Sequence, residues 1–562
     1  MNEVRKENRK KAQKPERKNS GFLVQGSIYA ASGIISSIIG LMYRLPLTRI
    51  IGDEGNGYYS AAFNVYTIIL LLSSYSLPLA VSKMVSARVA TKNYKNADRI
   101  LKASLAYATL VGFVGCAVIF SCADWFAGSF LHIPEAAWPL RALAPTVWIV
   151  SYLGVCRGYW QGHSTMVPTA LSQVIEQIVN ALVSVGAAWF LLRLSAEREV
   201  PDRIRRAFGA MGGTIGTGAG AFAALAVFLI LFIVRKKELQ RRHQDDCTVH
   251  VESFGEITKT LIMTVVPVIL STAIYNMGSI LDNAFYGHSM FIRGLQEQTA
   301  ADYGIYTTKY KILINVPVMV ANSVATSLIP ALSHANSAGD EKRVHENISS
   351  VIRFAMIVAI PSAVGLAAVA DPLIPLMFGK SDRAVVMMHF GCAAVVFYSL
   401  STVTNAILQG TSHMRVPVRH ALMSVVIHIA VLLFLLHVVR TGIFGVVLAD
   451  MCFAFSMCVL NGLSLKKLLN HRQEYRRTFF MPLFCALVMG ALTEAVKHAV
   501  LKSAGSRLLG IGISVAFAVI IYAFLLIRTG TITEEELKNF PKGKSLIRAA
   551  RRLRILKEKT GG

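Results

Sequence analysis

Residues 160–168 read WQGHSTMVP and residues 408–417 read LQGTSHMRVP, so the pattern Q-G-x-x-x-M, followed by a proline, occurs twice about 248 residues apart. Two further pairs recur in the same order at nearly the same offset: residues 76–83 (SLPLAVSK) with 327–334 (SLIPALSH), and residues 123–130 (ADWFAGSF) with 370–378 (ADPLIPLMF). Three matches in one order at one offset indicate an internal repeat.

The repeated stretches border long apolar runs. The chain has 562 residues, of which 54% are hydrophobic and 16% charged, against roughly a quarter charged in soluble proteins. Each run is about 20 residues long, the length that a helix needs to cross a bilayer. Membrane-spanning strands would instead alternate apolar and polar residues in pieces of about ten. The sequence therefore predicts an all-α polytopic membrane protein.

We expect about fourteen membrane-spanning helices. They cover residues 22–48, 58–82, 102–122, 141–160, 167–192, 209–234, 257–286, 302–330, 351–370, 386–409, 417–438, 442–464, 479–499 and 508–528. The repeat groups them into an N-lobe at 22–234, a C-lobe at 257–464 and a helix pair at 479–528, between basic tails at 1–21 and 529–562. Six helices per lobe give both lobes the same orientation, and two such lobes commonly enclose a central cleft that opens alternately to the two sides.

The basic residues indicate how the chain is oriented. The two tails and the loops after even-numbered helices carry about three times as many Lys and Arg residues as the other loops. Cytoplasmic loops carry this excess, so we expect both termini on the cytoplasmic side of a bacterial plasma membrane. The exception is loop 193–208, where five arginines are diluted by three acids.

Other classes of protein fit the composition poorly. The net charge of +26 does not indicate nucleic-acid binding, because it is concentrated in the tails and alternate loops, and the tails suit anionic inner-leaflet lipids. The eight cysteines show no C-x-x-C spacing and indicate neither a metal site nor a disulfide framework. No A-x-A site follows the first apolar run, which predicts a retained helix rather than a signal peptide.

Arginines occur inside the first predicted helix, in YRLPLTRIIGDEGNGYY at residues 43–59. Arg44 and Arg49 could hold a diphosphate, since a guanidinium binds phosphate oxygens in pairs. Five residues turn a helix by about 140°, so both would face one ligand only if Pro46 bends the helix. The alternative for Arg49 is that it extends to the outer membrane interface.

A polar stripe lies on the fifth predicted helix. Gln173, Glu176, Gln177 and Asn180 follow a spacing of three and four residues and share one helix face. Such a face must contact water or protein, so the stripe either lines a transport cavity or makes hydrogen bonds between helices.

Further polar residues lie in the second half of the chain. Asp282 and Asn315 are candidates for cavity or coupling roles, and Asp450 for a salt bridge or a cation site. Lys309 and Lys311 are about 200° apart on a helix, so we expect one of them to line a cavity. Lys83, in the first half, ends the second predicted helix and also suits a cytoplasmic anchor.

The glycine-rich run of the sixth predicted helix is not a nucleotide loop. Gly212, Gly216 and Gly220 lie in an apolar run without a following G-K-[ST], and they predict close packing against another helix. No cofactor, metal or nucleophile motif occurs, so we expect a transporter driven by ion or voltage gradients and no enzyme activity.

These stretches resemble a known family. YRLPLTRIIGDEGNGYY, SLPLAVSKMVSA, SQVIEQIVN, YGIYTTKYKILINVP and SLIPALS resemble the polysaccharide-flippase group of the MOP exporters, and within it the MurJ-like lipid II flippases of the stage V sporulation protein B and YtgP type. The resemblance spans almost the whole chain.

The resemblance implies fourteen helices in two lobes around a V-shaped cavity, with the last helix pair forming a groove for a lipid tail. It implies that the chain flips an undecaprenyl-diphosphate-linked cell-wall precursor outward. Family members hold the diphosphate with basic residues of helices 1, 2 and 8, which carry over to Arg44, Lys83 and Lys309 or Lys311. Lysines stand here where the family often has arginines.

We therefore expect a monomeric lipid II flippase that works by alternating access. The alternatives are a flippase for an exopolysaccharide or teichoic-acid precursor, a cation-coupled drug exporter of the MATE type, and a scaffold without transport. A site for cationic drugs should be acidic, whereas the predicted helices contain more basic than acidic residues, although Glu176 and Asp282 keep this alternative open.

Overall fold

The computed structural model describes residues 16–237, 241, 244, 246–504 and 507–531. The described chain is 89% helical and contains no strand, as the apolar runs predict. It divides into two compact units, residues 1–304 and 305–562. The predicted lobe boundaries, at residues 234 and 257, remain a prediction.

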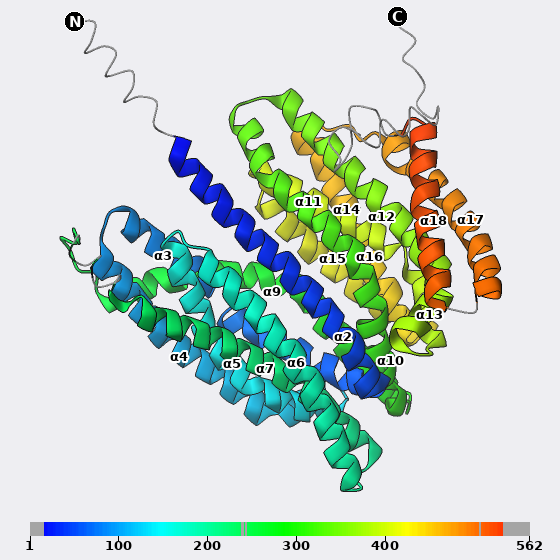
Figure 1. Ribbon diagram of the computed structural model, residues 1–562, viewed down its shortest axis with the longest axis horizontal. Helices are drawn as coiled ribbons and strands as arrows, with labels where there is room; N and C mark the ends of the chain where they lie inside the picture. Colours follow the sequence, from blue (N-terminus) through cyan, green and yellow to red (C-terminus); the bar gives the residue numbers. More distant parts are fainter. Residues whose placement is uncertain (1–15, 238–240, 242–243, 245, 505–506, 532–562) are drawn as a thin grey trace, which may run out of the picture. The chain divides into compact units, whose positions relative to one another are not determined.

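The described part of the first unit contains eight α-helices, several of which are labelled in Figure 1. They are α2 (Glu16–Ser73), which contains two helical parts, α3 (Leu77–Ala90), α4 (Tyr94–Asp124), α5 (Ala137–Gly162), α6 (Val167–Glu197), α7 (Asp202–Val234), α9 (Phe254–Ile292) and α10 (Gln296–Ile305). The short elements η1 (Trp125–Phe130) and η2 (Pro134–Ala136) connect α4 to α5. Helices α6 and α7 pack along each other, and α9 packs on α2, α3 and α4.

The second unit begins with the π-helical turn η4 (Tyr306–Tyr310). The longer helices that follow are α11 (Lys311–Ser337), α12 (Glu341–Phe378), α13 (Asp382–Gly391), α14 (Ala394–Gly410), α15 (Arg415–Leu433), α16 (Ile443–Leu469), α17 (Met481–Ala504) and α18 (Arg507–Arg528), with the π-helical turns η5 (Phe434–Val439) and η6 (Arg476–Phe480). Helices α17 and α18 lie side by side and pack on α12 (Figure 1).

Ten helical segments of the described residues are long and apolar enough to cross a membrane, or eleven if the bent pair α13–α14 is one span. One of them, Ala31–Ala90, has 60 residues and includes the first two predicted helices. The other predicted ranges also coincide with helices, and range 58–82 includes the turn at 74–76. The membrane fold is confirmed, and the number fourteen remains a prediction.

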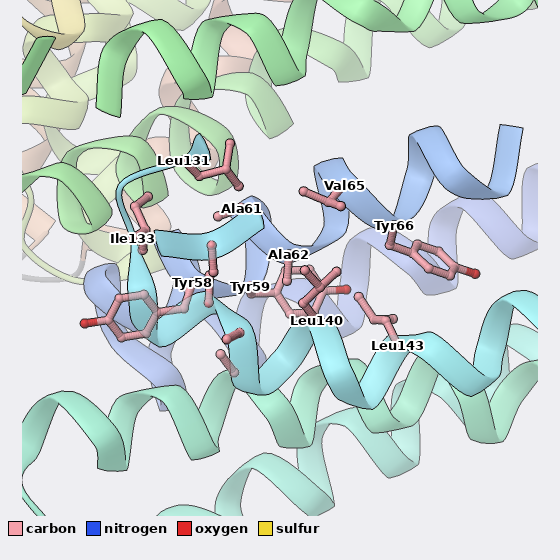
Figure 2. Close-up of a cluster of buried hydrophobic side chains, with 14 of the residues drawn as sticks. Tyr58, Tyr59, Ala61, Ala62, Val65, Tyr66, Leu131, Ile133, Leu140 and Leu143 are labelled. Atoms are coloured by element: carbon pink, nitrogen blue, oxygen red, sulfur yellow. The ribbon is translucent and has the colours of Figure 1, made fainter. Parts of the chain in front are cut away.

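The second half of α2 anchors the core of the first unit. Tyr58, Tyr59 and Tyr66 are each at most 7% exposed and belong to one buried hydrophobic cluster with Leu140 and Leu143 of α5, which are fully buried (Figure 2). Aromatic side chains bury large apolar areas, which stabilises the contact between two helices that lie far apart in the sequence.

The internal repeat recurs in the backbone. Left-handed backbone conformations occur at pairs of positions 247 or 248 residues apart: Lys92 and Gly339, His132 and Gly379, and Ser164 and Ser412. Left-handed residues end helices and reverse the chain. The two halves of the repeat therefore turn at equivalent places.

The repeated Q-G motif also has equivalent packing in the two units. A Cβ added at Gly162 of α5 would lie 2.6 Å from the Cβ of Val85 on α3. A Cβ added at Gly410 of α14 would lie 3.2 Å from the Cβ of Leu332 on α11. In both units the glycine thus lets its helix approach the helix that carries the S-L-P or S-L-x-P stretch of the repeat.

Candidate functional site

Arg44 lies on α2 with its side chain half-buried. Its guanidinium interacts with the phenol hydroxyls of Tyr43 and Tyr59. Among the residues that the structure describes, no carboxylate lies within ion-pair distance of it. A cation without a counter-charge inside an apolar helix bundle is costly, so the position favours an anionic ligand.

Arg49 does not share this environment. The backbone of α2 stays helical through Pro46, and its break lies at Gly52, where φ is 69°. Arg44 and Arg49 therefore leave one continuous helix about 140° apart. Arg49 is exposed, and so is Lys83 on α3.

The polar stripe of α6 makes hydrogen bonds to neighbouring helices. Ser32 of α2 donates to Oε1 of Gln173 at 3.1 Å, and Nδ2 of Asn180 donates to the hydroxyl of Tyr43 at 3.2 Å. The hydroxyl of Ser184 in turn donates to Oδ1 of Asn180 at 2.9 Å. The stripe therefore fastens α6 to α2, and Asn180 supports the tyrosine beside Arg44.

An ion pair within the apolar bundle joins α5 to α6. Nη2 of Arg157 lies 2.6 Å from Oε2 of Glu176, and Nε of Arg157 donates to the hydroxyl of Ser172 at 3.2 Å. Both charged side chains are about one-fifth exposed. This pairing gives Glu176 a structural partner. Arg157 was not a candidate from the sequence, although its position inside a predicted helix is the signal that could have revealed it.

The glycine ridge of α7 packs as expected. A Cβ added at Gly212, Gly216 or Gly220 would lie closer than 3.0 Å to atoms of α6. The ridge therefore holds α7 against the helix that carries the polar stripe.

In the second unit, Lys311 lies at the start of α11, directly after the π-helical turn η4. Its Nζ is 3.3 Å from Oδ1 of Asp450 on α16 and 5.1 Å from the centre of the Tyr306 ring. The hydroxyl of Tyr398 also donates to Oδ1 of Asp450, at 2.5 Å. Asp450 thus forms a salt bridge with Lys311. Of the two roles predicted for Asp450, a salt bridge or a cation site, the structure shows the salt bridge.

The remaining candidates have different environments. Lys309 is 2% exposed, whereas the side chain of Lys311 is 27% exposed, as residues on opposite sides of a helix would be. Asn315 is exposed one turn beyond Lys311. Asp282 is buried on α9 beside Asn283, whose side-chain amide has no hydrogen-bond partner among the described residues.

Each unit thus holds one half-exposed cation among tyrosines: Arg44 with Tyr43 and Tyr59 in the first, and Lys311 with Tyr306 and Tyr398 in the second. Phenol hydroxyls and cations are the donors that bind phosphate oxygens. Arg44 has no carboxylate partner among the described residues. Lys311 is paired with Asp450, so an anion would have to compete with Asp450 for it.

Comparison with known proteins agrees with this fold. The sequence model of a family described as "polysaccharide biosynthesis protein" matches residues 23–336, and the model described as MatE matches residues 267–434. Two Bacillus subtilis proteins are similar over most of their lengths. Stage V sporulation protein B is 26% identical, over 92% of this chain and 98% of its own length. The lipid II flippase MurJ is 24% identical, over 85% of this chain and 89% of its own length.

Solved structures share the fold at low sequence identity. An inward-facing MATE multidrug transporter of the MOP superfamily matches with a TM-score of 0.63 and 13% identity, over 77% of this chain and 94% of that one. An inward closed structure of the lipid II flippase MurJ matches with a TM-score of 0.58 and 14% identity, over 88% of this chain and 98% of that one. The chain therefore belongs to the polysaccharide biosynthesis protein family.

Proposed function

We propose that this protein flips a lipid-linked, diphosphate-containing cell-wall precursor, lipid II, from the inner to the outer leaflet of the bacterial plasma membrane. The observation that carries the proposal is Arg44, a guanidinium on a membrane-spanning helix that interacts with Tyr43 and Tyr59 and has no carboxylate partner among the described residues. A similar protein, the lipid II flippase MurJ, supports the choice of substrate class.

In this mechanism the headgroup enters the protein from the cytoplasmic side while the polyprenyl chain stays in the lipid. Arg44 binds the diphosphate, and Lys83, Lys309, Lys311 and Arg49 add positive charge along its path. The lobes then change orientation and release the headgroup outside. An inside-negative potential contributes about 2.3 kcal/mol per charge per 100 mV to the outward movement of the anion.

The cavity residues Gln173, Glu176, Asn180, Asp282 and Asn315 have supporting roles in this proposal. Gln173 and Asn180 hold α6 against α2, and Glu176 neutralises Arg157. Asp282 and Asn315 remain candidates for coupling transport to an ion.

The second candidate is a flippase for another lipid-linked saccharide, such as an exopolysaccharide or teichoic-acid precursor. The matched family description, "polysaccharide biosynthesis protein", favours this breadth of substrates. A MATE-type exporter of cationic drugs is less consistent with the site, because two of its carboxylates, Glu176 and Asp450, are already paired with Arg157 and Lys311.

The test is complementation of cells depleted of their lipid II flippase, together with a headgroup-accessibility assay for flipping. Arg44→Glu should abolish growth and flipping, because it replaces the anion-binding charge with a repulsive one. Arg44→Lys keeps the charge but loses paired binding, so it should lower flipping roughly tenfold.

Arg198→Glu is the matched control, because Arg198 is exposed near the end of α6 and takes the same change of charge. Growth with Arg44→Glu at normal membrane levels would refute the diphosphate role. Failure of the wild-type chain to complement, at good expression, would favour the second candidate.

A further inference from the structure

A pocket of about 690 Å³ lies within the second unit, between α12, α14, α16 and the segment 471–479. Nothing in the proposed transport cycle uses it. Its volume lies within the range of pockets that hold ligands of drug size. Its lining includes an apolar part, which we call the floor, and a basic part, which we call the mouth.

The floor of this α16 pocket is apolar. Ile352 of α12, Leu400 of α14, Leu463 of α16 and Phe479 of η6 line it. Val459 and Leu463 are also 44% and 61% exposed, on one face of a membrane-spanning helix. A hydrocarbon chain can therefore enter the pocket sideways from the bilayer.

The mouth of the pocket is basic. Lys466 at the end of α16 and Arg472 in the following loop both line it and are exposed. The neighbouring acid, Glu474, is engaged by Arg353, whose Nη2 lies 2.7 Å from its Oε2. The two cations at the mouth are therefore available to an anionic headgroup.

A buried histidine provides a second, independent sign of a ligand. His471 lines the pocket and is 5% exposed, and its Nε2 has no hydrogen-bond partner among the described residues. Its Nδ1 lies 3.4 Å from Nδ1 of His345. Burial and the neighbouring His345 lower the pKa of His471. An unpaired buried nitrogen is costly, and a phosphate or glycerol oxygen would satisfy it.

From this arrangement we infer that the α16 pocket binds one anionic phospholipid. One acyl chain occupies the apolar floor, and the phosphate lies between Lys466, Arg472 and His471. The loop that carries Arg472 is predicted to be cytoplasmic, so the lipid comes from the inner leaflet, where anionic headgroups attract basic segments. The pocket volume suits a single acyl chain better than the much longer chain of a polyprenyl lipid.

The experiment is native mass spectrometry of the full chain in detergent, titrated separately with phosphatidylglycerol and with phosphatidylcholine of the same acyl chains. The wild-type chain should retain one phosphatidylglycerol and prefer it to phosphatidylcholine. Lys466→Ser with Arg472→Ser should weaken phosphatidylglycerol binding roughly thirtyfold and remove the preference, because two headgroup contacts are lost.

A second variant blocks the pocket without touching a charge. A Cβ added at Gly462, which lines the pocket, meets no atom within 4 Å, so Gly462→Leu should fill the pocket without disturbing the backbone and prevent lipid retention. Gly186→Leu on α6 is the matched control, because a Cβ there also meets nothing within 4 Å. Thermal unfolding of each variant establishes that it is folded.

Equal retention of the two lipids by the wild-type chain, or unchanged retention by folded Gly462→Leu, would overturn the inference. In another outcome, an equimolar polyprenyl phosphate displaces phosphatidylglycerol from the wild-type chain but not from Gly462→Leu. That result would also overturn the inference and would assign the pocket to a polyprenyl lipid. Because no step measures flipping, these results are independent of the proposed transport function.

Discussion

Three cations within the apolar helices show how a membrane protein treats charge at the level of single residues. Arg157 and Lys311 are each paired with a carboxylate, Glu176 and Asp450, at distances of 2.6 and 3.3 Å. Arg44 interacts with Tyr43 and Tyr59, and it has no carboxylate partner among the described residues. Pairing lowers the cost of a charge in the bilayer, so a cation that lacks it is a candidate for binding an anion from outside the protein.

The Arg157–Glu176 pair predicts a specific pattern of stability. Glu176→Ala leaves Arg157 partly buried without its counter-charge, whereas the double variant Arg157→Ala/Glu176→Ala removes both charges. We expect the single variant to lower the melting temperature in detergent more than the double variant does, with a coupling free energy of about 1–3 kcal/mol. Additive effects of the two substitutions would show that the pair does not stabilise the contact between α5 and α6.

At the level of elements, small residues decide which helices approach closely. Gly216 of α7 faces Ser184 of α6, and Gly162 and Gly410 perform the same role at equivalent points of the repeat. Association of helices in a bilayer depends on packing and hydrogen bonds, because lipid is as apolar as the helix surface. A glycine at such a contact therefore contributes to specificity as well as to stability.

The glycine ridge predicts opposite outcomes for two similar substitutions. Gly216→Ala places a Cβ against the backbone and side chain of Ser184, so it should destabilise the protein by about 2–3 kcal/mol or prevent its accumulation. Gly186→Ala, on the facing helix α6, meets nothing within 4 Å and should cause no loss, since alanine favours helix more than glycine does. Thermal unfolding and membrane yield measure both, and equal tolerance of the two would contradict this account of α6–α7 packing.

At the level of the whole molecule, four of the five arginines of loop 193–208 have acidic partners. Arg203 and Arg206 pair with Glu297 and Glu54 from other parts of the first unit. Arg193 and Arg205 pair with nearby acids within the segment itself. These exposed pairs add little stability. The orientation rule counts Lys and Arg rather than net charge, so this loop stays an exception and the orientation stays a prediction.

The orientation is testable with two cysteines. In a variant that retains only Cys247, which is exposed in the loop after α7, an impermeant maleimide should leave intact cells unlabelled and react once they are permeabilised. A variant whose only cysteine comes from Ala196→Cys, exposed near the end of α6, should be labelled in intact cells. The reverse pattern would place both termini outside and invert the proposed direction of transport.

The sequence by itself determined the class of fold, the positions of the helices and the internal repeat. Apolar length and repeated motifs are properties of contiguous residues, and the requirement to satisfy backbone hydrogen bonds within the bilayer makes such runs helical. It also identified Arg44, the polar stripe of α6 and the glycine ridge of α7, since each stands out from its apolar surroundings along a single helix.

Only the tertiary structure decided which of these groups have partners. The pairing of Glu176 with Arg157, of Asp450 with Lys311 and of Asn180 with Tyr43 joins different helices, and a helical periodicity does not specify the neighbour that each face meets. The break in α2 likewise falls at Gly52, where φ is positive, while the helix continues through Pro46. The pocket beside α16 combines residues of three helices and a loop, so its apolar floor and basic mouth arise only when the chain is folded.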